Sequence, residues 1–289
     1  MTNALIGDVS DTAYWIAHLR SVETQRSDSL FRDPLAGLLA GDRGKAIADS
    51  MPYPSASGWA IVMRTCIIDD YVRAAIAEGC DTVLNLGAGL DTRPYRLELP
   101  ASLKWIEVDF PATIELKEER LAGETPRCQL RRVKLDLGDA AERRALLDEI
   151  DAQSGKVLVL TEGVVPYLSN EDVAALARDL EARPHFYAWV LEYVAPQFLK
   201  IARLMMRRRR RQLVNAPMKF KPGDWHAFFS EHGWAAREIR YLAEEGVRLE
   251  RSSPTPRWAW IVTRLMSREK RRALARNYGY AWLARSTRA

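Results

Sequence analysis

The chain has 289 residues, with 43 Lys and Arg against 38 Asp and Glu, and 47% of its residues are apolar. This composition excludes a fibrous or intrinsically disordered protein, because it supplies enough apolar side chains for a sizeable core. No stretch of about 18 apolar residues is present, and the first residues lack the basic and apolar regions of a signal peptide. We therefore expect one elaborated domain in the cytoplasm, with no membrane span.

The net charge of +5 is unevenly distributed along the chain. Residues 200–211 contain seven basic residues and no acid, and residues 266–289 contain seven basic residues and one acid. Charge runs mostly face solvent, although both segments are able to contact phosphate or an acidic partner. No aromatic residue is interleaved among Arg207–Arg211, and no nucleic-acid reader motif is recognised. Nucleic acid is therefore not the expected partner, and a non-catalytic nucleic-acid-binding protein stays an alternative.

The three cysteines, Cys66, Cys80 and Cys128, argue against a metal site and against a disulfide-stabilised fold. Their spacing fits neither a CxxC metal clip nor an even disulfide framework. We expect buried or partly buried free thiols and no metal site.

The pattern of apolar residues predicts helices first and then an alternation of strands and helices. Helices are expected over residues 12–26, 35–40 and 58–78, the last ending at Gly79. Strands are expected over residues 82–86, 103–108, 130–135, 157–160 and 185–194, with helices over 140–150 and 170–181 between them. Strands that alternate with helices predict an α/β fold with a doubly wound, mostly parallel sheet.

Two further helices and two further strands are predicted after Pro196. The helices cover residues 198–213 and 224–232, with Asp224 as the N-cap of the second, and the strands cover 236–242 and 257–264. From residue 267 on, Leu274, Tyr278, Ala281 and Trp282 have helical spacing and predict packing against the body. We thus expect a seven-stranded sheet in a single domain, residues 1–289. Its parts are a helical N-terminal cap (1–80), a core (81–195), a helical insertion (196–233), the last two strands (234–265) and a basic tail (266–289).

The most informative segment is a strand that runs directly into the glycine turn Gly87-Ala88-Gly89. Glycines at the carboxyl end of a central strand let the backbone come close to a ligand. The next strand ends in Asp109, whose carboxylate is positioned to accept both hydroxyls of a ribose. We therefore expect a nucleoside ligand.

The missing motifs narrow the choice of nucleoside. Thr92 stands where the dinucleotide fingerprint has its third glycine, and no GxxxxGK[ST] sequence is present. This weakens a nicotinamide dehydrogenase and favours S-adenosyl-L-methionine as the cofactor. Asp136 and Leu137 follow the third strand, where they would hold the adenine, and Glu162 follows the fourth. The alternative is that these three acids are helix caps or loop acids.

Three motifs together resemble the leucine carboxyl methyltransferase family, in particular its bacterial branch, which includes O-methyltransferases of polyketide biosynthesis. The sequence VLNLGAGLDTR begins at Val83, EVDFP begins at Glu107, and TEGVVPY begins at Thr161. VMRT, which contains Arg64, and FRDPLA, which begins at Phe31, are also similar to that branch. The resemblance runs from about residue 12 to residue 264 and implies a Rossmann-like class I methyltransferase fold.

The resemblance also implies residue roles in a site for S-adenosyl-L-methionine. Arg64 would pair with the carboxylate of the methionine moiety, and Glu162 would meet its amino group. Asp109 would bind the ribose, and Asp136 and Leu137 would flank the adenine. A further N-terminal basic contact of the family has no clear counterpart here except Arg20. The alternative for Arg64 is an ion pair with Asp69 or Asp70 on its own helix.

The methyl acceptor is expected to be a small molecule with a carboxylate or a hydroxyl, with polyketide-like acids among the candidates. A carboxylate with a pKa near 4 is already ionised at pH 7, whereas a phenol near 10 needs a general base. None of the four histidines falls in a motif that we can assign to the substrate, which favours a carboxylate. Tyr167 is a candidate substrate contact or simply a core aromatic. The basic insertion is a candidate lid, and a protein C-terminal carboxyl methyltransferase is the alternative within this fold.

Overall fold

The computed structural model describes residues 10–51, 54–195, 217–254 and 263–286, which contain a seven-stranded sheet of order β3-β2-β1-β4-β5-β7-β6. β1 to β5 are parallel to one another, and β7 is antiparallel to both β5 and β6. The predicted doubly wound, mostly parallel α/β sheet is thereby confirmed. The strands are β1 (Thr82–Leu86), β2 (Lys104–Asp109), β3 (Gln129–Lys134), β4 (Val157–Leu160), β5 (Phe186–Val194), β6 (Trp234–Tyr241) and β7 (Tyr278–Arg285).

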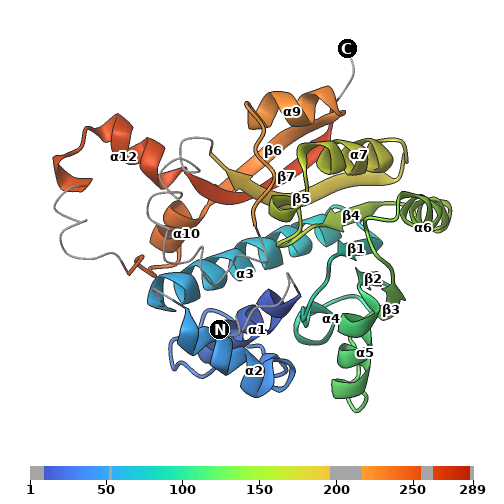
Figure 1. Ribbon diagram of the computed structural model, residues 1–289, viewed down its shortest axis with the longest axis horizontal. Helices are drawn as coiled ribbons and strands as arrows, with labels where there is room; N and C mark the ends of the chain where they lie inside the picture. Colours follow the sequence, from blue (N-terminus) through green and yellow to red (C-terminus); the bar gives the residue numbers. More distant parts are fainter. Residues whose placement is uncertain (1–9, 52–53, 196–216, 255–262, 287–289) are drawn as a thin grey trace, which may run out of the picture.

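Helices cover both faces of this sheet (Figure 1). α6 (Ala140–Gln153), α7 (Asn170–Glu181) and α9 (Trp225–Glu231) pack against one face, where they share a hydrophobic cluster with the strands. α3 (Pro54–Ala77) and α10 (Leu242–Arg248) contribute to a second cluster on the opposite face. α1 (Asp11–Thr24) and α2 (Ala36–Ser50) lie together near the start of α3. The remaining helices are α4 (Arg93–Arg96), α5 (Pro111–Arg120), η1 (Val165–Tyr167) and α12 (Arg268–Ala275).

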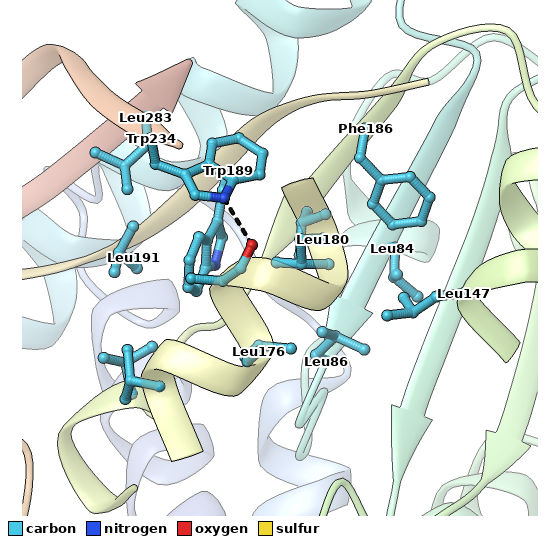
Figure 2. Close-up of a cluster of buried hydrophobic side chains, with 14 of the residues drawn as sticks. Leu84, Leu86, Leu147, Leu176, Leu180, Phe186, Trp189, Leu191, Trp234 and Leu283 are labelled. Atoms are coloured by element: carbon cyan, nitrogen blue, oxygen red, sulfur yellow. Dashed lines mark hydrogen bonds between the residues drawn. The ribbon is translucent and has the colours of Figure 1, made fainter. Parts of the chain in front are cut away.

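The larger cluster fixes the position of the last strands (Figure 2). Trp189 on β5 and Trp234 on β6 are both fully buried, with ring centroids 5.8 Å apart in an edge-to-face arrangement. The indole Nε1 of Trp234 donates a hydrogen bond to the carbonyl of Ala177 on α7, at 2.9 Å. Satisfying the one polar atom of this side chain lets it be buried without a desolvation penalty.

Most elements lie within a few residues of their predicted positions. β1 and β4 match the predicted strands, and α7 matches the predicted helix over residues 170–181. Asp224 is the N-cap of α9, because its side chain accepts a hydrogen bond from the backbone N–H of Ala227 at 3.0 Å. The three cysteines are buried free thiols, as expected. The helix predicted over residues 198–213 lies outside the described residues.

The prediction for the end of the chain is wrong. The last strand is β7, within the segment expected to be a basic tail, so the last two strands do not end at residue 265. Residues 257–262 of the predicted strand lie outside the described residues, and residues 263–265 are helical. β7 lies between β5 and β6, so both of its faces are buried: Ala281 and Leu283 point to one cluster, and Tyr280 and Trp282 to the other. A strand buried on both faces has no polar alternation, which is why its pattern resembled a helix.

Gly279 explains why a glycine stands inside this strand. It pairs with Tyr241 on β6, and a Cβ added to it would lie 2.2 Å from the carbonyl oxygen of Arg240. Glycine in a strand often marks such a close approach of two backbones. Among the described helices, none has the length and apolar character needed to cross a membrane.

Candidate functional site

A cavity of about 360 Å³ lies where β1, β2, β3 and β4 end at their carboxyl edge. Parallel strands place the residues that follow them at a common edge, where open α/β sheets bind ligands. The wall includes all eight predicted cofactor contacts and the candidate substrate contact: Arg64, Gly87, Ala88, Gly89, Asp109, Asp136, Leu137, Glu162 and Tyr167. The structure therefore brings these residues together from five separate segments of the chain.

The glycine turn after β1 forms the floor of this cavity. The backbone N–H groups of Gly87 and Ala88 both donate to the carbonyl of Val108 on β2, at 2.8 and 3.1 Å, which fixes the turn against the next strand. Gly87 has φ of 69°, and a Cβ at this position would lie 2.3 Å from Cγ2 of Val164. Only glycine meets both requirements without strain, which explains why a glycine lines the cavity at this position.

Two of the strand-end carboxylates are held by backbone groups. Asp109 accepts hydrogen bonds from the N–H of Gly89 at 2.7 Å and of Phe110 at 2.8 Å, and Asp136 accepts from Gly138 at 2.8 Å. A carboxylate has about four acceptor positions, so both groups retain acceptors for a ligand. The N-caps of the helices that follow are Phe110 and Asp139, which argues against helix capping as the role of Asp109 and Asp136.

The third carboxylate, Glu162, lies between two arginines. Its Oε1 is 2.5 Å from Nε of Arg64, and its Oε2 accepts a hydrogen bond from NH1 of Arg93 at 2.7 Å. Burial opposes ionisation of Glu162, but the positive charges of Arg64 and Arg93 outweigh it and lower the pKa of this carboxyl. One end of the cavity thus presents a fixed positive and a fixed negative charge side by side.

The alternative partner for Arg64 on its own helix is wrong. Asp69 is bound by Arg93 at 2.7 Å and by Arg96 at 2.6 Å, whereas Arg64 turns toward Glu162. Arg20 also lines the cavity, and its guanidinium binds Asp33 at 2.8 Å and the carbonyl of Leu90 at 2.6 Å.

The residues of the cavity wall to which sequence reasoning assigned no role include Asn85, Asp91 and Arg93. Asp91 accepts hydrogen bonds from Asn85 and from Arg93, each at 3.0 Å, and Arg93 in turn binds Asp69 on α3 and Glu162. Asp91 and Arg93 belong to the quoted motif, so their charge was a usable signal. The partners of Arg93, Asp69 and Glu162, lie 24 and 69 residues away in the chain, and no local sequence pattern indicates these pairings.

The remaining wall of the cavity is mostly apolar. α1 contributes Ala13 and Ile16, the turn before η1 contributes Val164, and Leu168 follows η1 beside Tyr167. Among the described residues that line the cavity, none is a histidine or a lysine. The described part of the chain also holds no group of three or more potential metal ligands.

The close approach at Gly87 gives a stability prediction. Gly87→Ala should lower the free energy of unfolding by roughly 3 kcal/mol, because the left-handed backbone costs about 1 kcal/mol with a Cβ and the clash with Val164 adds overpacking. Gly79→Ala is the matched control, since Gly79 has φ of 88° but nothing within 4 Å of the added Cβ. Urea unfolding of both variants measures the difference. An equal loss of unfolding free energy in Gly87→Ala and Gly79→Ala would show that the contact between residue 87 and Val164 is not tight.

Comparison with known proteins agrees with this geometry. The family model described as leucine carboxyl methyltransferase matches residues 13–181, which is more than half of the chain. The chain belongs to the leucine carboxyl methyltransferase family. The matched region includes most of α1, the glycine turn and every predicted site residue.

Relatives of this family member support the same assignment. Proteins from Mycobacteroides abscessus and Parafrankia sp. are 34% identical over 193 residues and 36% identical over 187 residues, and both carry the name "Putative S-adenosyl-L-methionine-dependent methyltransferase". These alignments cover 61% and 60% of the chain but only 62% and 58% of the relatives' own lengths. The crystal structure of a DUF574 family protein from Streptomyces avermitilis has the same fold, with a TM-score of 0.59, 18% identity, and coverage of 95% of this chain and 97% of that one.

Proposed function

We propose that the protein is an S-adenosyl-L-methionine-dependent O-methyltransferase that methylates a carboxylate of a small molecule. The observation that carries this proposal is the convergence of the glycine turn, Asp109, Asp136 and the Arg64–Glu162 pair on one cavity. Family membership and the names of the relatives support the same cofactor.

The residues present fit each part of this cofactor. The free acceptors of Asp109 suit the two hydroxyls of a ribose, and the backbone of Gly87 lines the same cavity. Asp136 and Leu137 offer an acceptor and an apolar surface to an adenine. A free amino acid end carries one negative and one positive charge, which matches the opposite charges of Arg64 and Glu162.

Methyl transfer from this cofactor requires no covalent nucleophile from the protein. When bound, the cofactor supplies a methyl group on a positively charged sulfur, ready for in-line displacement. The protein then has to orient the acceptor and keep water out. The apolar wall formed by Ile16, Val164 and Leu168 serves both purposes, with Tyr167 as a contact for the acceptor.

The titratable groups in the wall favour a carboxylate acceptor over a hydroxyl. A phenol or an alcohol needs a base that is unprotonated near neutral pH and free to take a proton, typically a histidine. The described residues of the wall include neither histidine nor lysine, and Glu162 and Asp91 are committed to arginines. A carboxylate is already ionised and needs no such group.

Calorimetric titration with S-adenosylhomocysteine tests the cofactor, with NADH as the control. We expect saturable binding of S-adenosylhomocysteine alone. Transfer of a labelled methyl group to a panel of aromatic and polyketide-like acids then tests the acceptor, because methyl esters are cleaved by mild alkali and methyl ethers are not. An alkali-stable product would favour a hydroxyl acceptor, and label found only in polypeptide would favour a protein carboxyl methyltransferase.

A further inference from the structure

A second buried carboxyl lies directly behind the charged end of the cavity. Glu192, on β5, is 3% exposed and does not line the cavity. Its Oε1 accepts a hydrogen bond from the N–H of Gly163 at 2.5 Å, and its Oε2 accepts none from the described residues. Gly163 directly follows Glu162 and lines the cavity, so one peptide separates the two carboxyls.

The same glycine also contacts Arg64. A Cβ added to Gly163, which has φ of 76°, would lie 3.2 Å from NH2 of Arg64. The guanidinium of Arg64 therefore lies close to the α-carbon of Gly163, and the N–H of Gly163 donates to Glu192. Arg64 carries a single positive charge between two carboxyls, Glu162 in the cavity wall and Glu192 behind it.

The charged side chains with the largest effect on Glu192 are Arg64 and Glu162. On β7, Tyr280 pairs with Glu192 in the sheet, and the hydroxyls of Tyr278 and Tyr280 are 3.4 Å apart. Both tyrosines stay neutral, because burial raises the pKa of Tyr278 to about 12 and also raises the pKa of Tyr280 well above its usual value. α3 contributes Arg64, and the turn after β4 contributes Glu162. Burial and the negative charge of Glu162 thus oppose ionisation of Glu192, whereas the positive charge of Arg64 and the N–H of Gly163 favour it.

We propose that Glu192 is a positioning residue for the cofactor, which fixes the Gly163 peptide and, when ionised, competes with the cofactor's carboxylate for Arg64. This inference rests on the proposed function. When Glu192 is protonated, the positive charge of Arg64 is fully available to bind the carboxylate of the ligand. When Glu192 is ionised, its negative charge offsets part of the charge of Arg64 and weakens that interaction. A ligand carboxylate that engages Arg64 offsets the positive charge that favours ionised Glu192, so binding favours the protonated form.

The protonation of Glu192 determines how the affinity for the ligand depends on pH. Burial raises the pKa of Glu192 to about 7 in the ligand-free protein. Because ligand binding raises this pKa further, binding takes up a proton. Affinity is greatest below pH 7 and falls as the pH rises through 7 and above. Burial lowers the pKa of His18, and this side chain is not in the wall of the cavity.

Titration calorimetry with S-adenosylhomocysteine from pH 6 to 8.5 tests the predicted pH dependence. Repeating the titrations in buffers of different ionisation enthalpy measures the number of protons taken up on binding. For the wild type we expect proton uptake at pH 7.5 and roughly fivefold to tenfold weaker binding at pH 8.5 than at pH 6. Glu192→Gln keeps an acceptor for Gly163 but does not titrate, so it should bind as well as the wild type at pH 6 and show no proton uptake. Glu192→Ala removes the acceptor and should bind more weakly at every pH.

Each failure has a separate reading. If the wild type binds without proton uptake, or if Glu192→Gln retains the uptake, the inference is overturned while the proposed function stands. If the wild type does not bind S-adenosylhomocysteine at all, the proposed function fails and the inference fails with it. Circular dichroism of both variants identifies a loss of fold. If Glu192→Ala does not fold, Glu192→Gln, which keeps the acceptor for Gly163, decides the matter.

Discussion

Asp109→Ala should weaken the binding of S-adenosylhomocysteine at least 100-fold. The substitution removes two charge-assisted hydrogen bonds to ribose hydroxyls, each contributing about 1.5 kcal/mol, which together correspond to roughly a factor of 100. It also releases the N–H of Gly89, which Asp109 holds at 2.7 Å, so the glycine turn loses an anchor. Calorimetric titration measures the loss.

Two further variants separate these effects. Asp109→Asn keeps one acceptor for Gly89 and should lose only about tenfold, since its hydrogen bonds to the ribose are no longer charge-assisted. Asp139→Ala removes a neighbouring acid that caps α6 and lies outside the cavity wall. It should cost about 1 kcal/mol of stability and leave binding unchanged. Unchanged affinity in folded Asp109→Ala would contradict the ribose assignment.

The site residues at the strand ends were predictable because the residues that follow parallel strands all lie at the carboxyl edge of the sheet. Asp109 ends β2, and Asp136 and Glu162 follow β3 and β4 within two residues, so the topology alone places them at one edge. Gly87 was predictable for the same reason. The fold class followed from the same alternation of strands and helices.

The parts that could not be predicted depend on contacts between distant segments. Arg93 binds acids on α3 and after β4, and Glu192 is linked to the site by its hydrogen bond to the N–H of Gly163. Neither contact leaves a local periodicity. β7 was mistaken for a helix because an internal strand has apolar residues on both faces, and the pairing of Gly279 with Tyr241 is visible only once β6 lies beside it.

The ion pair that fastens α5 to the sheet is the site of the largest expected effect on stability. Lys117 on α5 and Glu107 on β2 are both fully buried, with Nζ 2.7 Å from Oε1, and Arg132 on β3 binds the other oxygen at 3.0 Å. Lys117→Met leaves a buried carboxylate with one partner, so it should lower the free energy of unfolding by about 3 to 5 kcal/mol. Urea unfolding followed by tryptophan fluorescence measures this.

A surface lysine in the same region provides the control. Lys134 on β3 lies 3.3 Å from Glu115 and is 41% exposed, so Lys134→Met removes an equal charge at a cost of about 1 kcal/mol or less. The double variant Glu107→Gln/Lys117→Met should be more stable than Lys117→Met, because it also removes the carboxylate that the single variant leaves buried with one partner. Equal losses for Lys117→Met and Lys134→Met would mean that burial adds nothing to the first pair. Because β2 ends in Asp109, loosening α5 should also weaken binding of S-adenosylhomocysteine, which links the stability of this pair to the geometry of the site.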